Sequence, residues 1–305
     1  GRDEAVGGAG RRRPAAARTL AALGAAAALA GCAALGSTEA RYARLLEDYE
    51  RSGRLRTEAA PGDAPFGDAD LVRNFERIAF HSEFSTASGP LVARPERVAL
   101  FRWLGPLRWR LEGDAATEAD RETLRALTAR IARLTGLDVS EAAPGETATM
   151  VVLVAGPGLR RAFVEALDDD APPDRLRLLR TWAADDRYPC VGQVGVSPEA
   201  GRTRGLIAIK GETRGLLRRG CLHEEMVQSL GLLNDDDAAR PSIFNDDQEF
   251  ALLTRHDEWL LRILYDPRLE SGMTAEAGMP VVRRIVDEIG PGARSVAAGP
   301  PPLAP

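Results

Sequence analysis

A short apolar run near the middle of the chain, residues 149–154, constrains the fold most strongly. Its residues are β-branched or apolar without interruption, which is typical of a strand buried on both faces. Helical patterns lie on both sides of this strand. Before it, Thr117 and Gly136 are suited to begin and end a helix whose leucines follow helical spacing. A buried strand between helices indicates an α/β fold.

Other segments extend this pattern in both directions. Further strands are expected over residues 98–103, 107–111, 191–196 and 205–210. The last two flank a turn, and their pairing stays open. Further helices are expected over residues 39–56, 160–167, 176–183 and 274–289. Asp70 is expected to cap a helix with one apolar face, and Thr254 with Asp257 resembles a capping box for a helix that ends near Asp266.

The N-terminus has the architecture of a bacterial export signal. A basic region at residues 11–18 precedes an apolar run over residues 20–30, which is shorter than the roughly 20 residues that span a bilayer. The run ends in Leu29-Ala30-Gly31-Cys32, which resembles a lipobox. We therefore expect residues 1–32 to form a lipoprotein signal peptide with its lipobox, and Cys32 to carry the lipid. Ala33 rather than Asp follows, so the expected location is the outer membrane, facing the periplasm.

Export predicts the state of the remaining cysteines. Cys190 and Cys221 form an even pair in an oxidising compartment, and we expect a disulfide between them. Closing a loop of this size contributes about 3 kcal/mol in the chain-entropy model. The alternative is two buried free thiols.

Composition limits the partners and divides the chain. The formal net charge is −5, Lys210 is the only lysine, and no basic patch alternates with aromatic residues, which argues against a nucleic-acid partner. Residues 33–95 are expected to form a tether and an N-terminal helical segment, and residues 96–289 the main domain. The Pro/Gly/Ala-rich residues 290–305 are expected to form a disordered tail.

The segment at residues 224–235 has the spacing of a zinc-protease helix. In the pattern H-E-x-x-H-x-x-G-x-x-H, three histidines hold zinc and the glutamate polarises the bound water. Here the glutamate and the glycine are retained as Glu225 and Gly231, whereas the histidine positions hold Glu224, Gln228 and Asn234. Asp235 follows directly.

The replaced positions decide the expected metal chemistry. One carboxylate and two amides form a weak zinc site, because zinc prefers imidazole and thiolate. The nearby Asp235-Asp236-Asp237 adds oxygen atoms that suit Ca²⁺ or Mg²⁺, but the spacing fits no EF-hand loop. We expect no cofactor. The alternative is a divalent cation (Ca²⁺, Mg²⁺ or Zn²⁺) held by Glu224, Gln228 and Asn234.

Residues within and beyond this segment resemble a family of bacterial lipoproteins, the domain of unknown function 2927. The resemblance is dense over about residues 190–289 and thinner back to Leu71. It is carried by Cys221, Glu224-Glu225, Gln228-Ser229-Leu230-Gly231, Asn234-Asp235, Ser242-Ile243-Phe244-Asn245-Asp246, Leu253-Thr254, His256-Asp257, Leu264-Tyr265-Asp266-Pro267 and Gly272-Met273-Thr274. The family implies no established activity.

A second resemblance is to the metzincin peptidases. In these proteins helices and a mostly parallel sheet precede the active-site helix, and a turn with Met and a closing helix follow. Ser242-Ile243-Phe244 stands at the place of that turn, with Phe244 in the Met position, and residues 253–265 stand at the place of the closing helix. The resemblance implies a zincin-like domain with a mixed, mostly parallel sheet and a degenerate active-site helix.

These observations lead to two main functional hypotheses. The first is a pseudoenzyme: an envelope lipoprotein that binds an envelope protein, peptide or glycan in the inherited cleft, with Glu224, Gln228, Gly231, Asn234, Asp235 and Phe244 around it. The second is an active metallohydrolase with Glu225 as general base. A third reading is a tethered spacer without a ligand.

Overall fold

A computed structural model describes residues 37–84, 93–167, 173–197, 201–245 and 247–294. The expected signal peptide and the lipidation site Cys32 lie outside these residues, as does the tail beyond Arg294. None of the described helices is both long and apolar enough to cross a membrane.

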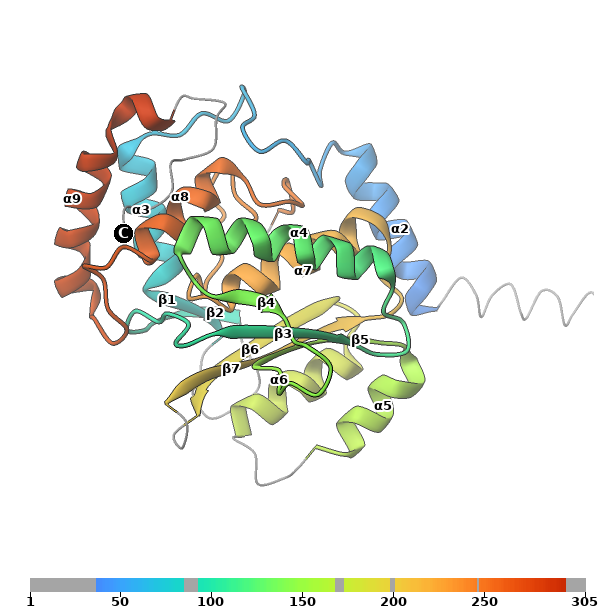
Figure 1. Cartoon of the computed structure of the whole chain (residues 1–305). Helices are drawn as coiled ribbons and strands as arrows, with labels where there is room; N and C mark the ends of the chain where they lie inside the picture. Colours follow the sequence, from blue (N-terminus) through green and yellow to red (C-terminus); the bar gives the residue numbers. More distant parts are fainter. Residues whose placement is uncertain (1–36, 85–92, 168–172, 198–200, 246, 295–305) are drawn as a thin grey trace, which may run out of the picture.

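A five-stranded sheet in the order β4-β3-β5-β7-β6 runs through the middle of the molecule (Figure 1). Its strands are β3 (Leu107–Glu112), β4 (Val139–Glu141), β5 (Met150–Ala155), β6 (Cys190–Ser197) and β7 (Arg202–Lys210). All neighbours are parallel except β6, which runs antiparallel to β7. The fold is therefore a mixed α/β fold with a mostly parallel sheet, as the sequence predicts.

Strand β5 explains the uninterrupted apolar run. Val152 and Val154 pack into a core on one face of the sheet, and Leu153 and Ala155 pack into a second core on the other face. Helices α4 (Glu118–Thr135) and α7 (Gly215–Gln228) cover the first face, and α5 (Pro157–Glu165) and α6 (Pro173–Ala184) cover the second (Figure 1). With both faces covered, a strand needs no polar alternation.

The larger core continues beyond the sheet. It is completed by α3 (Asp68–Ala79), α8 (Arg255–Leu264) and α9 (Ala275–Arg294), and α2 (Thr38–Arg51) lies beside α7 (Figure 1). A separate antiparallel pair joins β1 (His81–Phe84) to β2 (Ala93–Arg97). The expected domain boundary after residue 95 falls inside β2, and Leu71 and Phe75 of α3 belong to the same core as the sheet.

Local capping signals predict the helix ends well. Thr117 accepts a hydrogen bond from the N–H of Asp120, and Gly136 ends α4 with a φ of 71°, a conformation that glycine adopts without strain. Thr254 and Asp257 form the expected capping box of α8. Asp70 is not the cap residue itself. Gly67 caps α3 and donates its N–H to the Asp70 carboxylate, so the helix begins before Asp70.

Two further local expectations are wrong, and two short strands were not expected. Residues 98–103 form no strand, because Leu100 instead exchanges backbone hydrogen bonds with Gly272 and Met273. The short strands β1 and β4 carry too few residues for a clear pattern and are not predicted. Helix α9 continues to Arg294, so the first residues of the expected tail are helical.

The expected disulfide between Cys190 and Cys221 is present. It joins the first residue of β6 to the middle of α7, and the two cysteines are 31 residues apart in the sequence. The bridge thus fixes the helix that carries Glu224 and Glu225 to the edge strand of the sheet.

This bridge predicts a measurable loss of stability on its removal. The double variant Cys190→Ser/Cys221→Ser should lose about 3 to 4 kcal/mol of unfolding free energy, because its unfolded chain regains the entropy of the open loop. Urea denaturation of residues 33–305 measures this difference. Under reducing conditions the wild type should approach the variant, and equal stabilities of oxidised wild type and variant would contradict the expectation.

Candidate functional site

A cavity of about 620 Å³ lies between strand β6 and helix α7. Its walls come from α2, β1, the first two turns of α6, the segment before β6, the strand β6, one side of α7, the loop after α7 and Gln248. Carboxyl, amide, hydroxyl and guanidinium groups all reach this space, for example those of Glu224, Gln228, Ser229 and Arg175. The cavity is therefore a polar site built by segments that are distant in the sequence.

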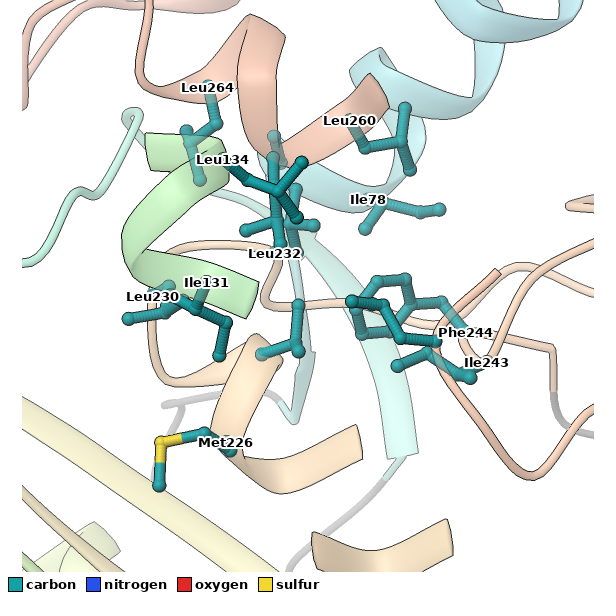
Figure 2. Close-up of a cluster of buried hydrophobic side chains, with 14 of the residues drawn as sticks. Ile78, Ile131, Leu134, Met226, Leu230, Leu232, Ile243, Phe244, Leu260 and Leu264 are labelled. Carbon is teal, nitrogen blue, oxygen red and sulfur yellow. The ribbon is translucent and has the colours of Figure 1, made fainter. Parts of the chain in front are cut away.

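Helix α7 contributes one polar face to the cavity. Cys221, Glu224, Glu225 and Gln228 follow the three- and four-residue spacing of one helical face, and all four line the cavity. Met226 lies on the opposite side and is fully buried in the core (Figure 2). The same helix thus anchors itself through its apolar face and presents the motif residues on the other.

Glu225 carries a carboxyl group that is almost withdrawn from solvent, with the residue only 5 % exposed. Burial, and then the charge of Asp235, raise the pKa of Glu225 to about 8. Among the described residues, none donates a hydrogen bond to this carboxyl. Asp235 itself accepts a hydrogen bond from Nε2 of Gln228 at 3.1 Å. At neutral pH Glu225 is therefore largely protonated.

Strand β6 passes this carboxyl closely because residue 192 is glycine. Oε2 of Glu225 lies 2.6 Å from the position that a Cβ would occupy on Gly192. Gly195 makes a similar approach, with Nη2 of Arg175 at 2.5 Å from its Cβ position. Successive residues of a strand alternate between its faces, so these two positions point to opposite faces. The carboxyl lies on the α7 face and the guanidinium on the α6 face.

Helix α2 closes another side of the cavity with Leu45 and Tyr49. It is held by Asp186, which accepts hydrogen bonds from the Thr38 hydroxyl at 2.9 Å and, through its backbone oxygen, from the Tyr42 hydroxyl at 3.0 Å. The buried Lys210 forms an ion pair with the same Asp186 at 3.0 Å. The position of this wall therefore depends on a buried polar network.

Four motif residues meet in the cavity, namely Glu224, Glu225, Gln228 and Asp235. Glu224 also influences Tyr49 of α2. Burial raises the pKa of Tyr49, Arg54 lowers it, and the charge of Glu224 raises it.

Three other predicted residues lie outside the cavity. The Asn234 amide is buried and donates to the backbone oxygens of Arg77 and Asp235. Phe244 is fully buried in the core (Figure 2). Gly231 has a φ of 125°, and a Cβ there would lie 2.0 Å from the backbone oxygen of Phe101. Gly231 therefore permits a close turn but does not touch the site.

The donor atoms do not fit the metal site of the peptidase pattern. Of the three residues that stand in the histidine positions, Glu224 and Gln228 line the cavity. Asn234 instead donates a hydrogen bond to the backbone of α3. One carboxylate and one neutral amide are a poor ligand set for zinc. Within the described ranges, no three His, Cys, Asp or Glu side chains are grouped so that they could hold a metal ion.

Sequence reasoning missed the part of the site that β6 and α6 provide. Gly192 and Arg175 line the cavity, and Gly195 is in close contact with Arg175. The available signal was the pair of glycines inside the valine-rich strand expected over residues 191–196, since glycine there often marks the close approach of another group. Arg175 carried no comparable signal, because nothing local relates it to Gly195.

The observed molecule is thus a mixed α/β protein with a polar cavity at the antiparallel edge of a mostly parallel sheet. Residues 68–284 match the family model described as "Protein of unknown function (DUF2927)". This match covers more than half of the chain, so the chain belongs to this family, as the motif residues suggest. No curated protein and no solved structure matches the chain.

The buried carboxyl of Glu225 predicts how stability depends on pH. The pKa is raised from 4.5 to about 8 in the folded protein, so the folded chain keeps a proton that the unfolded chain releases. Stability should therefore fall as the pH rises through this window. The variant Glu225→Gln removes the ionisable group, and its unfolding free energy relative to wild type should increase by a few kcal/mol between about pH 5 and 8, at about 1.4 kcal/mol per pKa unit.

Urea denaturation across this pH range is the measurement, and the control is Glu47→Gln, which changes an exposed glutamate on α2. The control should follow the wild-type profile. If Glu225→Gln also followed it, the raised pKa of Glu225 would be refuted.

Proposed function

We propose that this chain is an exported envelope lipoprotein whose zincin-like domain binds an extended peptide segment of another envelope protein without cleaving it. The export and the lipid anchor on Cys32 rest on the N-terminal sequence pattern. The binding function rests on the position of β6 in the wall of the cavity.

The observation that carries the proposal is the outer edge of β6. This strand ends the sheet order, and β7 is its one partner among the described strands. The backbone N–H of Lys210 donates to the backbone oxygen of Pro189. From this pair onward, residues of β6 that are hydrogen-bonded to β7 alternate with residues that are not. The N–H and C=O groups of Cys190, Gly192 and Val194 therefore point away from β7, along the cavity.

Such an edge favours a peptide over a glycan. A row of backbone donors and acceptors at strand spacing matches the backbone of an extended chain, which adds to the sheet as a further strand. Cys190, Gly192 and Val194 all line the cavity, so an added strand would lie within it. The side chains of α7 would then meet the peptide from one face.

The arrangement of parts supports the zincin-like assignment. The mostly parallel sheet precedes α7, which carries Glu225. The turn at residues 242–244 and the helix α8 follow, in the order of the peptidases that the motif resembles. The assignment remains one of architecture, and fold likeness alone does not define function.

The chemistry of the site favours binding over cleavage. Glu225 is largely protonated at neutral pH, because its pKa is raised to about 8 by burial and by Asp235, and a protonated carboxyl cannot accept a proton from water. The displaced Asn234 leaves an incomplete ligand set for a metal that would polarise a carbonyl group.

A test of the edge-strand proposal uses Val194, whose N–H points outward. Peptides are first selected against residues 33–305 from a randomised display library. The variant Val194→Pro removes the outward N–H and no bond to β7, so it should weaken binding of the selected peptides about tenfold, the equivalent of one hydrogen bond. Val194→Ala keeps the N–H and is the matched control. Equal binding by both variants, measured by calorimetry, would exclude strand addition.

The second candidate is a metallohydrolase, and one observation favours it: Glu224, Glu225 and Gln228 all line the same cavity. Elemental analysis of residues 33–305, purified without a metal-affinity tag, separates the candidates. Peptide binding without cleavage predicts no stoichiometric metal. Stoichiometric metal together with chelator-sensitive peptide cleavage that Glu225→Ala abolishes would replace our proposal by the second candidate.

A further inference from the structure

The carboxyl of Glu225 lacks a donor that its burial calls for. The residue is only 5 % exposed, and it lines the cavity. No described residue donates a hydrogen bond to it. A buried acceptor without a donor is unfavourable, and a ligand that supplies a donor or a positive charge relieves this cost. The group is thus aimed at the space that a ligand would fill.

The surroundings of Glu225 have a negative character on this side of β6. Glu224 is its neighbour on the cavity face of α7, and Asp235 follows on the loop. Glu83 of β1 and the hydroxyl group of Tyr49 of α2 line the same cavity. The charge of Asp235 acts directly on the Glu225 carboxyl and raises its pKa, so a cationic group beside this pair is favoured over an anionic one.

On the other face of β6, helix α6 contributes Asp174 and Arg175 to the cavity lining. Arg175 of α6 lines the cavity and approaches Gly195, and it forms no ion pair with another described residue. Arg187 also lines the cavity, but its guanidinium is paired with Asp185 at 2.6 Å. The acidic and basic groups therefore approach β6 at Gly192 and Gly195, from opposite sides.

We propose that the peptide bound along β6 carries a basic side chain, Lys or Arg, opposite Gly192 and an acidic side chain three residues away, opposite Gly195. This proposal rests on the peptide binding proposed above. Directly opposed residues of two paired strands share a face, so the basic side chain meets Glu225 and Asp235 and the acidic one meets Arg175. The odd spacing of three residues is required because the two faces alternate.

The proposal also fixes the direction of a pH dependence. The charged or titratable groups that line the cavity with Glu225 come from α7 (Glu224), the following loop (Asp235), β1 (Glu83) and α2 (Tyr49). Asp174 and Arg175 of α6, and Arg187 and Tyr188 of the segment before β6, line the same cavity. Burial and Asp235 raise the pKa of Glu225, so a cationic side chain must displace its proton. Binding of the basic peptide should release protons and become tighter as the pH rises from about 6 to 8.

The test uses a synthetic, β-prone peptide of Thr and Val residues that contains one Lys and one Glu three positions apart. Calorimetry with residues 33–305 compares it with peptides in which Gln replaces the Lys or the Glu. We expect each Gln peptide to bind about tenfold more weakly, because a charge-assisted hydrogen bond is lost. The protein variant Glu225→Gln should abolish the preference for Lys, and Arg175→Gln should abolish the preference for Glu.

The outcomes separate this inference from the proposed function. Equal binding of the Lys peptide and its Gln counterpart, or no binding of the Lys peptide to wild type, would overturn the inference. If library-selected peptides still respond to Val194→Pro in that case, the proposed strand addition stands and only the charge pattern is wrong. A Lys preference that persists in Glu225→Gln would likewise assign the selectivity to another group and overturn the inference.

Discussion

The site depends on how helix α7 is held between two environments. Its apolar side is buried in the core with residues such as Met226, and its polar side forms a wall of the cavity. The disulfide from Cys221 to Cys190 fixes the polar side against the edge strand β6. Because the helix is anchored on both sides, the carboxyl of Glu225 stays in contact with Gly192 and cannot escape to solvent without a change in packing.

This arrangement stores an unfavourable electrostatic state. A carboxyl that is buried and close to Asp235 resists ionisation, which the raised pKa of Glu225 expresses. The rest of the fold compensates for it through the two cores on either face of β5 and through satisfied networks such as the one around Asp186. Perturbed groups in cavities are common at functional sites, and we propose that a positive charge on a ligand stabilises the ionised form of this one.

Local sequence signals predicted much of the fold because their causes are local. The apolar run of β5, the caps at Thr117, Gly136 and Thr254, and the presence of the strands β6 and β7 each depend on neighbouring residues, whereas the sequence left the pairing of these two strands open. The segment 98–103 was misassigned because its backbone pairs with Gly272 and Met273, partners that lie far along the chain. The motif spacing placed Glu224, Glu225 and Gln228 correctly on one face, since helical geometry fixes that relation.

The sequence by itself determined the fold class, the family, the disulfide pair and the helical face that carries the motif. Only the tertiary structure decided which residues share the cavity. After the turn at Gly231 the chain no longer follows helical geometry, so the amide of Asn234 bonds to the backbone of α3 while Asp235 reaches the cavity. Tertiary packing also decided the contacts of Gly192 with Glu225 and of Gly195 with Arg175. These contacts join β6 to α7 and α6, and distances between separate elements are set by packing rather than by spacing along the chain.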